Sequence, residues 1–375
     1  MNKFAVLGAN GFIGTRLTEM FALSDLTEVR PIVRNYSSLA RASRFNLDSR
    51  VADAFDQKSL ENSFLGCDVV VHAVAGDIQT VLGTLTPVYQ AAQNAGVRRL
   101  VYLSSSSVHG QAPAPGTDEE SALSDQQVLP YNNAKVHAEL TLSQLRKQGD
   151  VELVILRPGI VFGPRSFWVT RFAEGLLAGH ASVLNRGTGI CNSIYVDNLV
   201  HAIYLAGTHP NADQEVFLLG DQECVTWADL YQPIARALGY DLADLPEGVI
   251  AVQDPAPKPS WFDRLEPIRV SRPVQALLSI FPHKYRVAAY RAYETILESR
   301  MDSFPNSPEK APPVISREMA LLYSCQYKLP HEKANRIVGY QPPVSFSEAV
   351  RRTVAWLAFA GYPVKDEAMN MRSQV

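Results

Sequence analysis

A tyrosine and a lysine, Tyr131 and Lys135, are four residues apart in "LPYNNAKVHAEL" (129–140), a stretch that otherwise has the composition of a helix. Residues at this spacing on a helix are neighbours on one face. A lysine ammonium beside a phenol stabilises the phenolate, so we expect Lys135 to lower the tyrosine pKa from about 10. Such a tyrosine can exchange a proton with a carbinol oxygen. Because the same pair also occurs on solvated helix faces, its interpretation depends on the neighbouring motifs.

Serines end the predicted strand just before this helix, in "LVYLSSSSVHG" (100–110). A serine hydroxyl at the end of that strand could share a substrate oxygen with Tyr131. The serine run therefore favours a chemical role for the Tyr131–Lys135 pair over a solvated helix face.

Three glycines at the beginning of the chain lie between a short apolar run and apolar residues at helical spacing, in "KFAVLGANGFIGTRLTEMF". This pattern predicts a strand, a tight turn and a helix. The glycines permit the turn, the approach of backbone to a pyrophosphate, and close helix–strand packing. The helix N-terminus favours an anion. We therefore expect a dinucleotide to bind Gly8, Asn10, Gly11, Phe12, Ile13 and Gly14; the alternative is a glycine-rich loop without a ligand.

The second predicted strand, "EVRPIVR", ends at Arg34, twenty residues after Gly14. An acidic residue at this position would bind the ribose 2′-hydroxyl of NAD, whereas an arginine suits the 2′-phosphate of NADP. The sequence therefore favours NADP over NAD, unless Arg34 merely points to solvent.

The first half of the chain alternates between strand and helix patterns, which indicates a parallel sheet covered on both faces. We expect an α/β fold: a Rossmann-type doubly wound parallel sheet in residues 1–160, to which later strands return, and a smaller, mixed substrate-binding region in residues 161–375. Ligands should bind beyond the carboxyl ends of the strands. After the strand that begins at Phe4, strands are predicted over 28–34, 49–55, 67–76, 97–105, 151–159 and 215–220, and helices over 57–66, 78–96, 131–149 and 196–207.

The composition sets limits on the class of protein. The net charge of −3 argues against a general nucleic-acid-binding protein, and 46% apolar residues allow a sizeable core. Cys67, Cys191, Cys224 and Cys325 lack the paired spacing of a disulfide framework or zinc site. With no secretory leader and no long apolar run, we expect a cytoplasmic protein that binds a small molecule and no metal.

Seven motifs resemble the extended short-chain dehydrogenases/reductases, also called the NAD-dependent epimerase/dehydratase family. In chain order they are "GANGFIG", "VADAFD", "HAVAG", "YLSSSSVHG", "YNNAK", "LRPGIVFGPR" and "IYVDNLVHA". The resemblance covers roughly residues 3–240 and resumes at "KANRIVGYQPPVSFSEAVRRTVAWL". It implies an enzyme with an NAD(P) cofactor, and family members often form homodimers.

The resemblance also assigns roles. Tyr131 is implied as the catalytic acid/base, with Lys135 as its partner. Alignment on Gly110 places the family's catalytic serine or threonine at Ser105, with Ser106 as a possible substitute. Cofactor contacts are implied for Asp53, Ala73, Val74, Ala75, Tyr131, Lys135, Pro158 and Ile160, in addition to the glycine loop and Arg34, and substrate contacts for Ser106, His109, Arg165 and Asn192.

Differences from the family's motifs reduce the number of activities that we expect for this chain. The sugar dehydratases carry two carboxylates where this chain has Ser106 and Ser107, and nucleotide-sugar enzymes carry Asn and Arg where it has Ile160 and Cys191. Burying a diphosphate without such donors is costly. "YVDNLVHA" also resembles the 3β-hydroxysteroid dehydrogenase and dihydroflavonol reductase branch. We expect a dehydrogenase or reductase for a fairly apolar alcohol or ketone; the alternatives are a nucleotide-sugar 4-epimerase and a non-catalytic cofactor sensor.

Residues 258–300 depart most from the family. They contain eight Lys and Arg against four Asp and Glu, with apolar residues at helical spacing. Basic amphipathic helices suit an anionic membrane surface. The same pattern suits a lid over the substrate cleft or a subunit interface, so weak peripheral membrane contact is one of three expectations.

Overall fold

The computed structural model describes residues 1–250 and 313–365. Within them, one compact unit comprises residues 1–248 and 318–365, and the other residues 249–250 and 313–317. In the second unit, β12 (Val249–Ile250) pairs in parallel with β13 (Val314–Ile315). The basic segment 258–300 lies outside the described residues.

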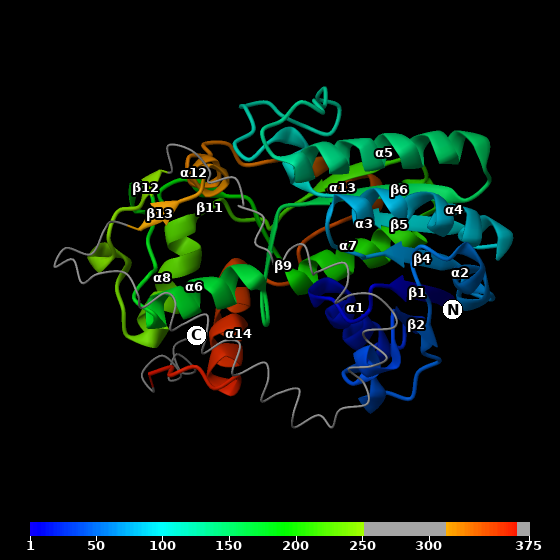
Figure 1. The fold of residues 1–375 in the computed structure, drawn as a ribbon, viewed down its shortest axis with the longest axis horizontal. Helices are drawn as coiled ribbons and strands as arrows, with labels where there is room; N and C mark the ends of the chain where they lie inside the picture. The colour runs from blue at the N-terminus through cyan, green and yellow to red at the C-terminus, as the bar shows by residue number, and fades with distance from the viewer. Residues whose placement is uncertain (251–312, 366–375) are drawn as a thin grey trace, which may run out of the picture. The chain divides into compact units, whose positions relative to one another are not determined.

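A seven-stranded sheet forms the centre of the first unit, in the order β10-β6-β5-β4-β1-β2-β3 (Figure 1). All of its neighbouring strands are parallel, which confirms the predicted sheet. The order reverses between β1 and β4, the point where an open parallel sheet binds its ligand. The strands are β1 (Asn2–Leu7), β2 (Thr27–Val33), β3 (Arg50–Val51), β4 (Val69–His72), β5 (Arg99–Leu103), β6 (Glu152–Pro158) and β10 (Val216–Leu219).

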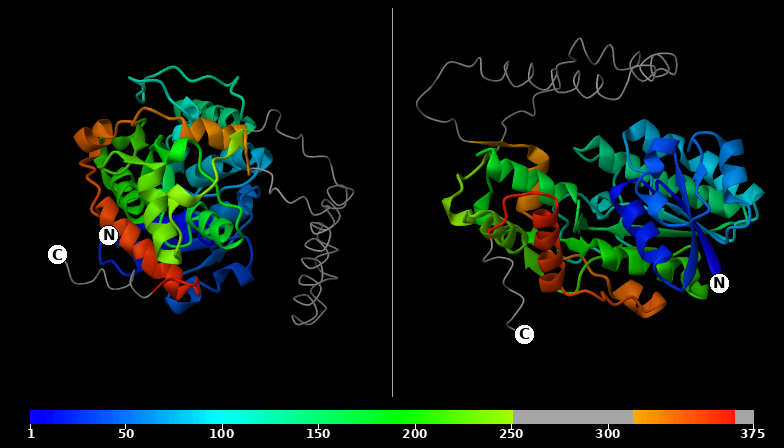
Figure 2. Two further views of the ribbon diagram at one scale, coloured as in Figure 1. Left: turned by 90° about the vertical axis from the view of Figure 1, so that its left-hand side faces the viewer. Right: turned by 90° about the horizontal axis from the view of Figure 1, so that it is seen from below.

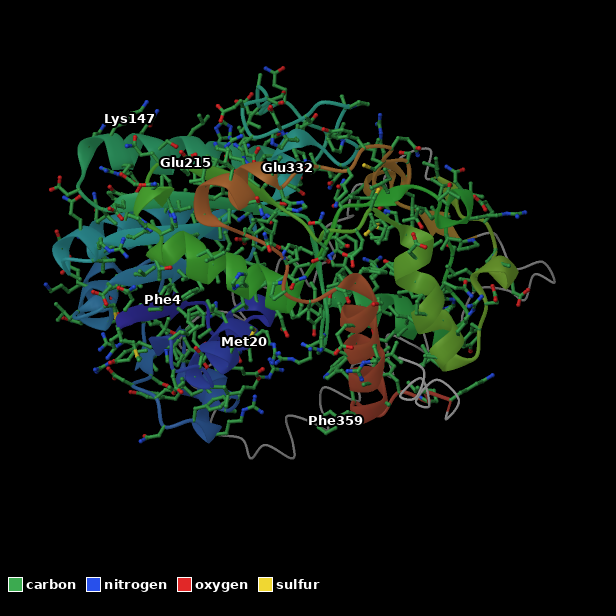
Figure 3. The ribbon with its side chains drawn as sticks, turned by 180° about the vertical axis from the view of Figure 1, so that it is seen from behind. Phe4, Met20, Lys147, Glu215, Glu332 and Phe359 are labelled. Carbon is green, nitrogen blue, oxygen red and sulfur yellow. The ribbon has the colours of Figure 1, made fainter. Side chains whose placement is uncertain are left out.

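Helices cover both faces of this sheet, and each face has its own apolar core (Figures 1 and 2). One core joins the sheet to α1 (Phe12–Ala22), α7 (Val196–Thr208) and α13 (Glu332–Val338). In Figure 3, Phe4 of β1 and Met20 of α1 belong to this face. The other core joins the sheet to α2 (Gln57–Phe64), α3 (Ile78–Gly83), α4 (Leu85–Asn94) and α5 (Pro130–Gln148).

The single helix predicted over 78–96 is two helices, α3 and α4, that meet at Thr84. Pro87 explains the break. It has no N–H to donate to Gly83, and its ring would clash with that carbonyl in a continuous helix. The apolar periodicity of the sequence continues across the break, because α3 and α4 both contribute apolar residues to the same core on one face of the sheet.

Short strands and helices build the rest of the first unit. β7 (Ile160–Phe162) pairs in parallel with β9 (Ser193–Tyr195), and β8 (Ile190–Cys191) pairs antiparallel with β11 (Val225–Thr226). Aromatic rings fill the interior; Phe172 and Tyr231 stack with centroids 4.0 Å apart. Phe359, at the end of the last helix, projects away from the protein (Figure 3). The helices are α6 (Phe167–Leu177), α8 (Trp227–Leu238), α12 (Arg317–Tyr323) and α14 (Phe346–Phe359), and the 3₁₀ helices of the unit are η1 (Tyr36–Leu39), η2 (Ala42–Arg44), η3 (Ser106–His109), η4 (Asn185–Gly187), η5 (Pro210–Ala212) and η6 (Leu242–Asp244).

Among the helices that the structure describes, none is long and apolar enough to cross a membrane.

Candidate active site

The glycine loop lies at the point where the strand order reverses. Gly8 has a φ of +91°, and a Cβ on it would lie 2.7 Å from the carbonyl oxygen of Ala73, at the end of β4. A Cβ on Gly14 would collide with the Gly8 carbonyl. Gly11 is the N-cap of α1 and offers no side chain to the first turn. The loop therefore presents backbone N–H groups that suit a pyrophosphate.

The other predicted cofactor residues gather at the same edge of the sheet. Arg34 follows β2 and is exposed, while Asp53 follows β3 and accepts a hydrogen bond from the Phe55 N–H at 3.1 Å. Ala73, Val74 and Ala75 follow β4, Pro158 ends β6, and Ile160 begins β7.

A further arginine, Arg41, lies between η1 and η2, and its Nη1 contacts the carbonyl oxygen of Asn10 at 3.5 Å. This contact was not predicted, because the stretch after Arg34 has neither strand nor helix periodicity. Arg165 lies nearby: burial lowers its pKa, and Arg41 adds to this effect.

Tyr131 and Lys135 lie in the first two turns of α5, which begins at Pro130, a residue suited to the first helical position. Tyr131 remains 43% exposed, whereas Lys135 is buried. The ammonium lies 5.9 Å from the centroid of the Tyr131 ring. It donates hydrogen bonds to the Tyr102 hydroxyl at 3.2 Å and to the Leu103 carbonyl at 2.8 Å.

The expected lowering of the Tyr131 pKa is wrong for this structure. Partial burial raises the pKa of Tyr131, and Glu318 adds to the increase. The physical reason is the direction of the ammonium, which donates to Tyr102 and Leu103 on β5 rather than to the Tyr131 oxygen. Burial lowers the pKa of Lys135 to about 8.

The serine run forms the turn between β5 and η3. Ser105 is the N-cap of η3, and its Oγ accepts a hydrogen bond from the Ser107 N–H at 3.1 Å. Ser104 donates to Glu139, which pairs with Arg157 at 2.7 Å. Among the described residues, the buried Oγ of Ser107 has no hydrogen-bond partner.

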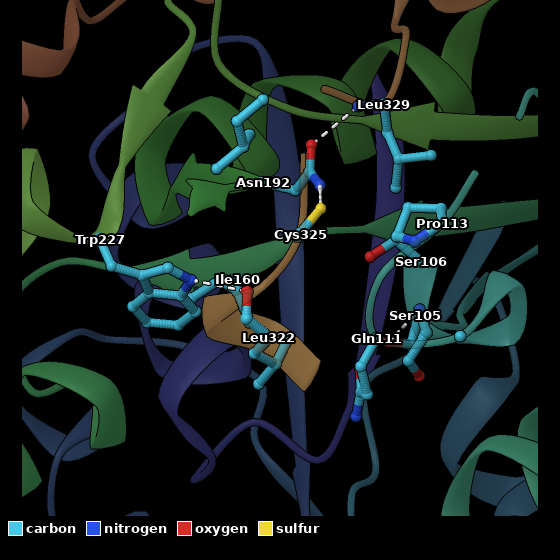
Figure 4. A pocket seen from close by; sticks show the side chains of 14 residues that line it. Ser105, Ser106, Gln111, Pro113, Ile160, Asn192, Trp227, Leu322, Cys325 and Leu329 are labelled. Carbon is cyan, nitrogen blue, oxygen red and sulfur yellow. Dashed lines mark hydrogen bonds between the residues drawn. The ribbon is translucent and has the colours of Figure 1, made fainter. Parts of the chain in front are cut away.

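A cavity of about 50 Å³ opens beside these serines (Figure 4). Its polar wall includes Ser105, Ser106, Ser107, Gln111 and Asn192. Its apolar wall consists mainly of Ile160, Ile190, Trp227, Leu322, Cys325 and Leu329. No charged side chain is found among the described residues that line it. The space holds only a few water molecules, so a larger substrate must displace part of the wall.

Asn192 lines this cavity, but its amide is hydrogen-bonded to a later segment of the same chain (Figure 4). Its Nδ2 donates to the Tyr327 carbonyl at 3.0 Å, and its Oδ1 accepts from the Leu329 N–H at 2.8 Å. The Trp227 indole N–H similarly donates to the Leu322 carbonyl at 3.1 Å. These contacts attach residues 322–329 to the wall of the cavity.

Two other residues predicted to contact substrate, His109 and Arg165, do not line this cavity. His109 Nε2 lies 3.1 Å from Arg157, and burial together with Arg157 lowers the His109 pKa to about 4. Arg165 has charged neighbours in Arg41, Glu19 and Arg44, which places it near α1 and the glycine loop. Trp227, Leu322 and Leu329 were not predicted as site residues, because they lie outside the seven motifs and an apolar side chain alone does not indicate a binding role.

The sequence model of the NAD dependent epimerase/dehydratase family matches residues 4–220. A UDP-glucose 4-epimerase of Vibrio cholerae is 27% identical over 264 residues, which cover 64% of this chain and 76% of that protein. A 3-beta-hydroxysteroid dehydrogenase of Mycolicibacterium neoaurum is 28% identical over 277 residues, which cover 65% of this chain and 72% of that protein.

The fold is similar to that of the UDP-glucose 4-epimerase of Thermotoga maritima, solved with UDP-glucose. The TM-score is 0.65 at 18% sequence identity, over 96% of this chain and 99% of that one. The family match covers more than half of this chain and includes the glycine loop, the serine turn and the Tyr131–Lys135 pair. The protein therefore belongs to the NAD dependent epimerase/dehydratase family.

Proposed function

We propose that the protein is an NAD(P)-dependent dehydrogenase or reductase that acts on a fairly apolar alcohol or ketone. The cavity beside Ser105 carries this proposal, since Ile160, Ile190 and Trp227 line it and no charged side chain is found among the described residues around it. The position where nucleotide-sugar enzymes carry an arginine holds Cys191, which is buried. A diphosphate would lack charged donors on this wall.

The side chains divide the chemistry between them. A nicotinamide cofactor held at the glycine loop would supply hydride to a carbonyl carbon of the substrate, or accept it from a carbinol carbon. Tyr131 gives a proton to the carbonyl oxygen in reduction and takes it back in oxidation. Ser105 orients that oxygen, and the ammonium of Lys135 stabilises the Tyr131 phenolate that is left after reduction.

Replacement of Tyr131 tests this assignment. Tyr131→Phe should reduce kcat by about 10² or more, the scale of lost general acid–base catalysis, and leave cofactor affinity nearly unchanged. The measurement is the change in reduced-nicotinamide absorbance with a panel of apolar ketones and secondary alcohols. Tyr240→Phe is the matched control, because Tyr240 has similar exposure, 39%, and lies just after α8. Unchanged turnover in Tyr131→Phe would refute the acid/base role.

We also propose NADP as the preferred cofactor, bound at its 2′-phosphate by Arg34. Arg41 supports this choice, because it brings a second exposed guanidinium beside the glycine loop. A guanidinium keeps its charge and can form two parallel hydrogen bonds to a phosphate.

Dissociation constants for NADP and NAD test the cofactor preference. Arg34→Ala and Arg41→Ala should each weaken NADP binding about 10-fold or more, the cost of losing a charged hydrogen bond, and change NAD binding little. Arg236→Ala, on α8, is the control and should change neither constant. Tighter binding of NAD than NADP, unaffected by Arg34→Ala, would show that Arg34 does not read the 2′-phosphate.

A nucleotide-sugar 4-epimerase is the second candidate, supported by the similarity to UDP-glucose 4-epimerases. It needs the same serine, tyrosine and lysine. An epimerase retains its cofactor through turnover, whereas a reductase must release it. Purified protein that holds reduced cofactor through gel filtration, and converts UDP-glucose without added cofactor, would favour the epimerase over our proposal.

A further inference from the structure

The ammonium of Lys135 is held by the neighbouring strand, not by its own helix. Both of its hydrogen-bond acceptors, the Tyr102 hydroxyl at 3.2 Å and the Leu103 carbonyl at 2.8 Å, belong to β5. Tyr102 is 1% exposed and Lys135 is 4% exposed, so water cannot readily replace either acceptor. An ammonium has three N–H donors. Two of them are bound to β5, and the ammonium lies 5.9 Å from the centroid of the Tyr131 ring.

We propose that Tyr102 is a positioning residue for proton transfer: its hydroxyl accepts a hydrogen bond from Lys135, which keeps the ammonium charged and holds it 5.9 Å from the centroid of the Tyr131 ring. This inference rests on the proposed roles of Tyr131 and Lys135. A buried charge is costly unless its donors are satisfied, and a hydrogen bond from a charged donor is stronger than a neutral one.

The other ionisable groups near Lys135 do not replace this contact. Burial raises the pKa of Tyr102 above its usual range, so Tyr102 stays neutral as an acceptor. His72 of β4 is also neutral, because burial and the charge of Lys135 lower its pKa to about 3. Glu139, one turn along α5, raises the pKa of Lys135, but its carboxylate is engaged by Arg157 and Ser104. Tyr131, the fourth group, is the residue whose proton transfer Lys135 assists.

Loss of the Tyr102 hydroxyl should lower the pKa of Lys135. It removes an acceptor from the charged form of Lys135, so the ammonium should lose its proton at a lower pH. The pKa of Lys135, about 8 with Tyr102 present, should fall by about 1 to 2 units, the scale of one hydrogen bond to a charged group. The alkaline limb of kcat/KM should move to lower pH by the same amount.

Tyr102→Phe tests the proposal, with Tyr89→Phe as the matched control. Tyr89 is 2% exposed and donates its hydroxyl to the Val151 carbonyl at 2.9 Å, so it loses a comparable buried hydrogen bond away from Lys135. The direct measurement is a pH titration of the lysine amines by NMR in ¹⁵N-lysine-labelled protein. The signal that disappears in Lys135→Arg identifies Lys135. We expect a shift in Tyr102→Phe and none in Tyr89→Phe.

A Lys135 titration in Tyr102→Phe that matches the wild type would overturn the proposal. A shifted titration with an unshifted rate profile would retain the hydrogen bond and refute the catalytic use of Lys135 instead, so the two failures are distinguishable. Should Tyr102→Phe not fold, fluorotyrosine at position 102 keeps the shape and makes a weaker acceptor. It should shift the titration in the same direction by a smaller amount.

Discussion

At the scale of single residues, the sequence predicted the groups that carry charge or a reactive hydroxyl, but not the groups that hold them in place. Tyr131 and Lys135 lie on α5 as their spacing predicted. Tyr102 was not predicted, because it belongs to a strand buried on both faces, where no alternation marks one side chain as different. The Lys135 ammonium donates to that strand and not to the Tyr131 oxygen. The raised pKa of Tyr131, which is due to burial and Glu318, could therefore not be predicted from α5 alone.

Ser107 offers a prediction at the same scale. Ser107 lines the cavity, and its buried Oγ has no hydrogen-bond partner among the described residues. An unsatisfied buried hydroxyl costs free energy, which a substrate oxygen could recover. Ser107→Ala should leave the free energy of unfolding unchanged or raise it by up to about 1 kcal/mol, and raise KM about 2- to 10-fold for substrates with a second oxygen near the reacting carbon.

Urea unfolding and steady-state kinetics measure the two effects of Ser107→Ala. The exposed Ser124 provides the control, Ser124→Ala, which should leave KM unchanged. If Ser107→Ala destabilised the protein and left KM as in the wild type, its hydroxyl would have a structural role and no contact with substrate.

At the scale of elements, the alternation of strand and helix was predictable wherever segments were long enough to show a period. The strands of the sheet and the helices that cover it follow the apolar pattern. The cavity wall did not show such a pattern, because β7, β8, β9 and β11 are only two or three residues long. It depends instead on contacts between distant parts of the chain, such as that between Asn192 and Leu329, 137 residues apart.

Asn192→Ala tests how firmly residues 322–329 are attached. The change leaves the Leu329 N–H and the Tyr327 carbonyl without the partners that Asn192 provides. Unpaired backbone groups of this kind cost about 1 to 3 kcal/mol, so the free energy of unfolding should fall by that amount. Urea unfolding measures it, with Asn211→Ala, at an exposed position, as the control. A loss equal to that of the control would mean that Asn192 does not hold this segment.

At the scale of the whole molecule, similarity to relatives identifies the family, whereas the substrate class has to be inferred from the geometry of the cavity. Identity to a UDP-glucose 4-epimerase and to a 3-beta-hydroxysteroid dehydrogenase is nearly equal, 27% and 28%, so similarity alone does not separate the two substrate classes. The nucleotide-binding half of the fold serves either class. Our proposal places the difference in the cavity wall, where apolar side chains from β7, β8, α8 and residues 322–329 meet.

Buried histidines make the stability of the whole molecule depend on pH. Burial lowers the pKa of His72 from 6.5 to about 3 and that of His109 to about 4. Between these values and about pH 6.5 the unfolded chain binds more protons than the folded protein, so the free energy of unfolding falls as the pH falls. Asp221 acts in the opposite direction, because burial raises its pKa from 3.8 to about 7. Burial also lowers the pKa of His201 and His331 and raises that of Glu119, so four histidines oppose two carboxyls and leave a net loss of stability in acid.

His72→Asn isolates the largest of these contributions. His72 is 1% exposed, and its Nε2 lies 3.0 Å from the Thr84 hydroxyl, a contact that an asparagine amide can retain in part. Where the unfolded chain holds one extra proton, the slope is about 1.4 kcal/mol per pH unit. Urea unfolding between about pH 6 and pH 4 should therefore show a shallower slope by roughly that amount in His72→Asn. His180→Asn, at an exposed position, should keep the wild-type slope. Equal slopes in His72→Asn and the wild type would mean that His72 takes up its proton in the folded protein, and acid sensitivity would then arise elsewhere.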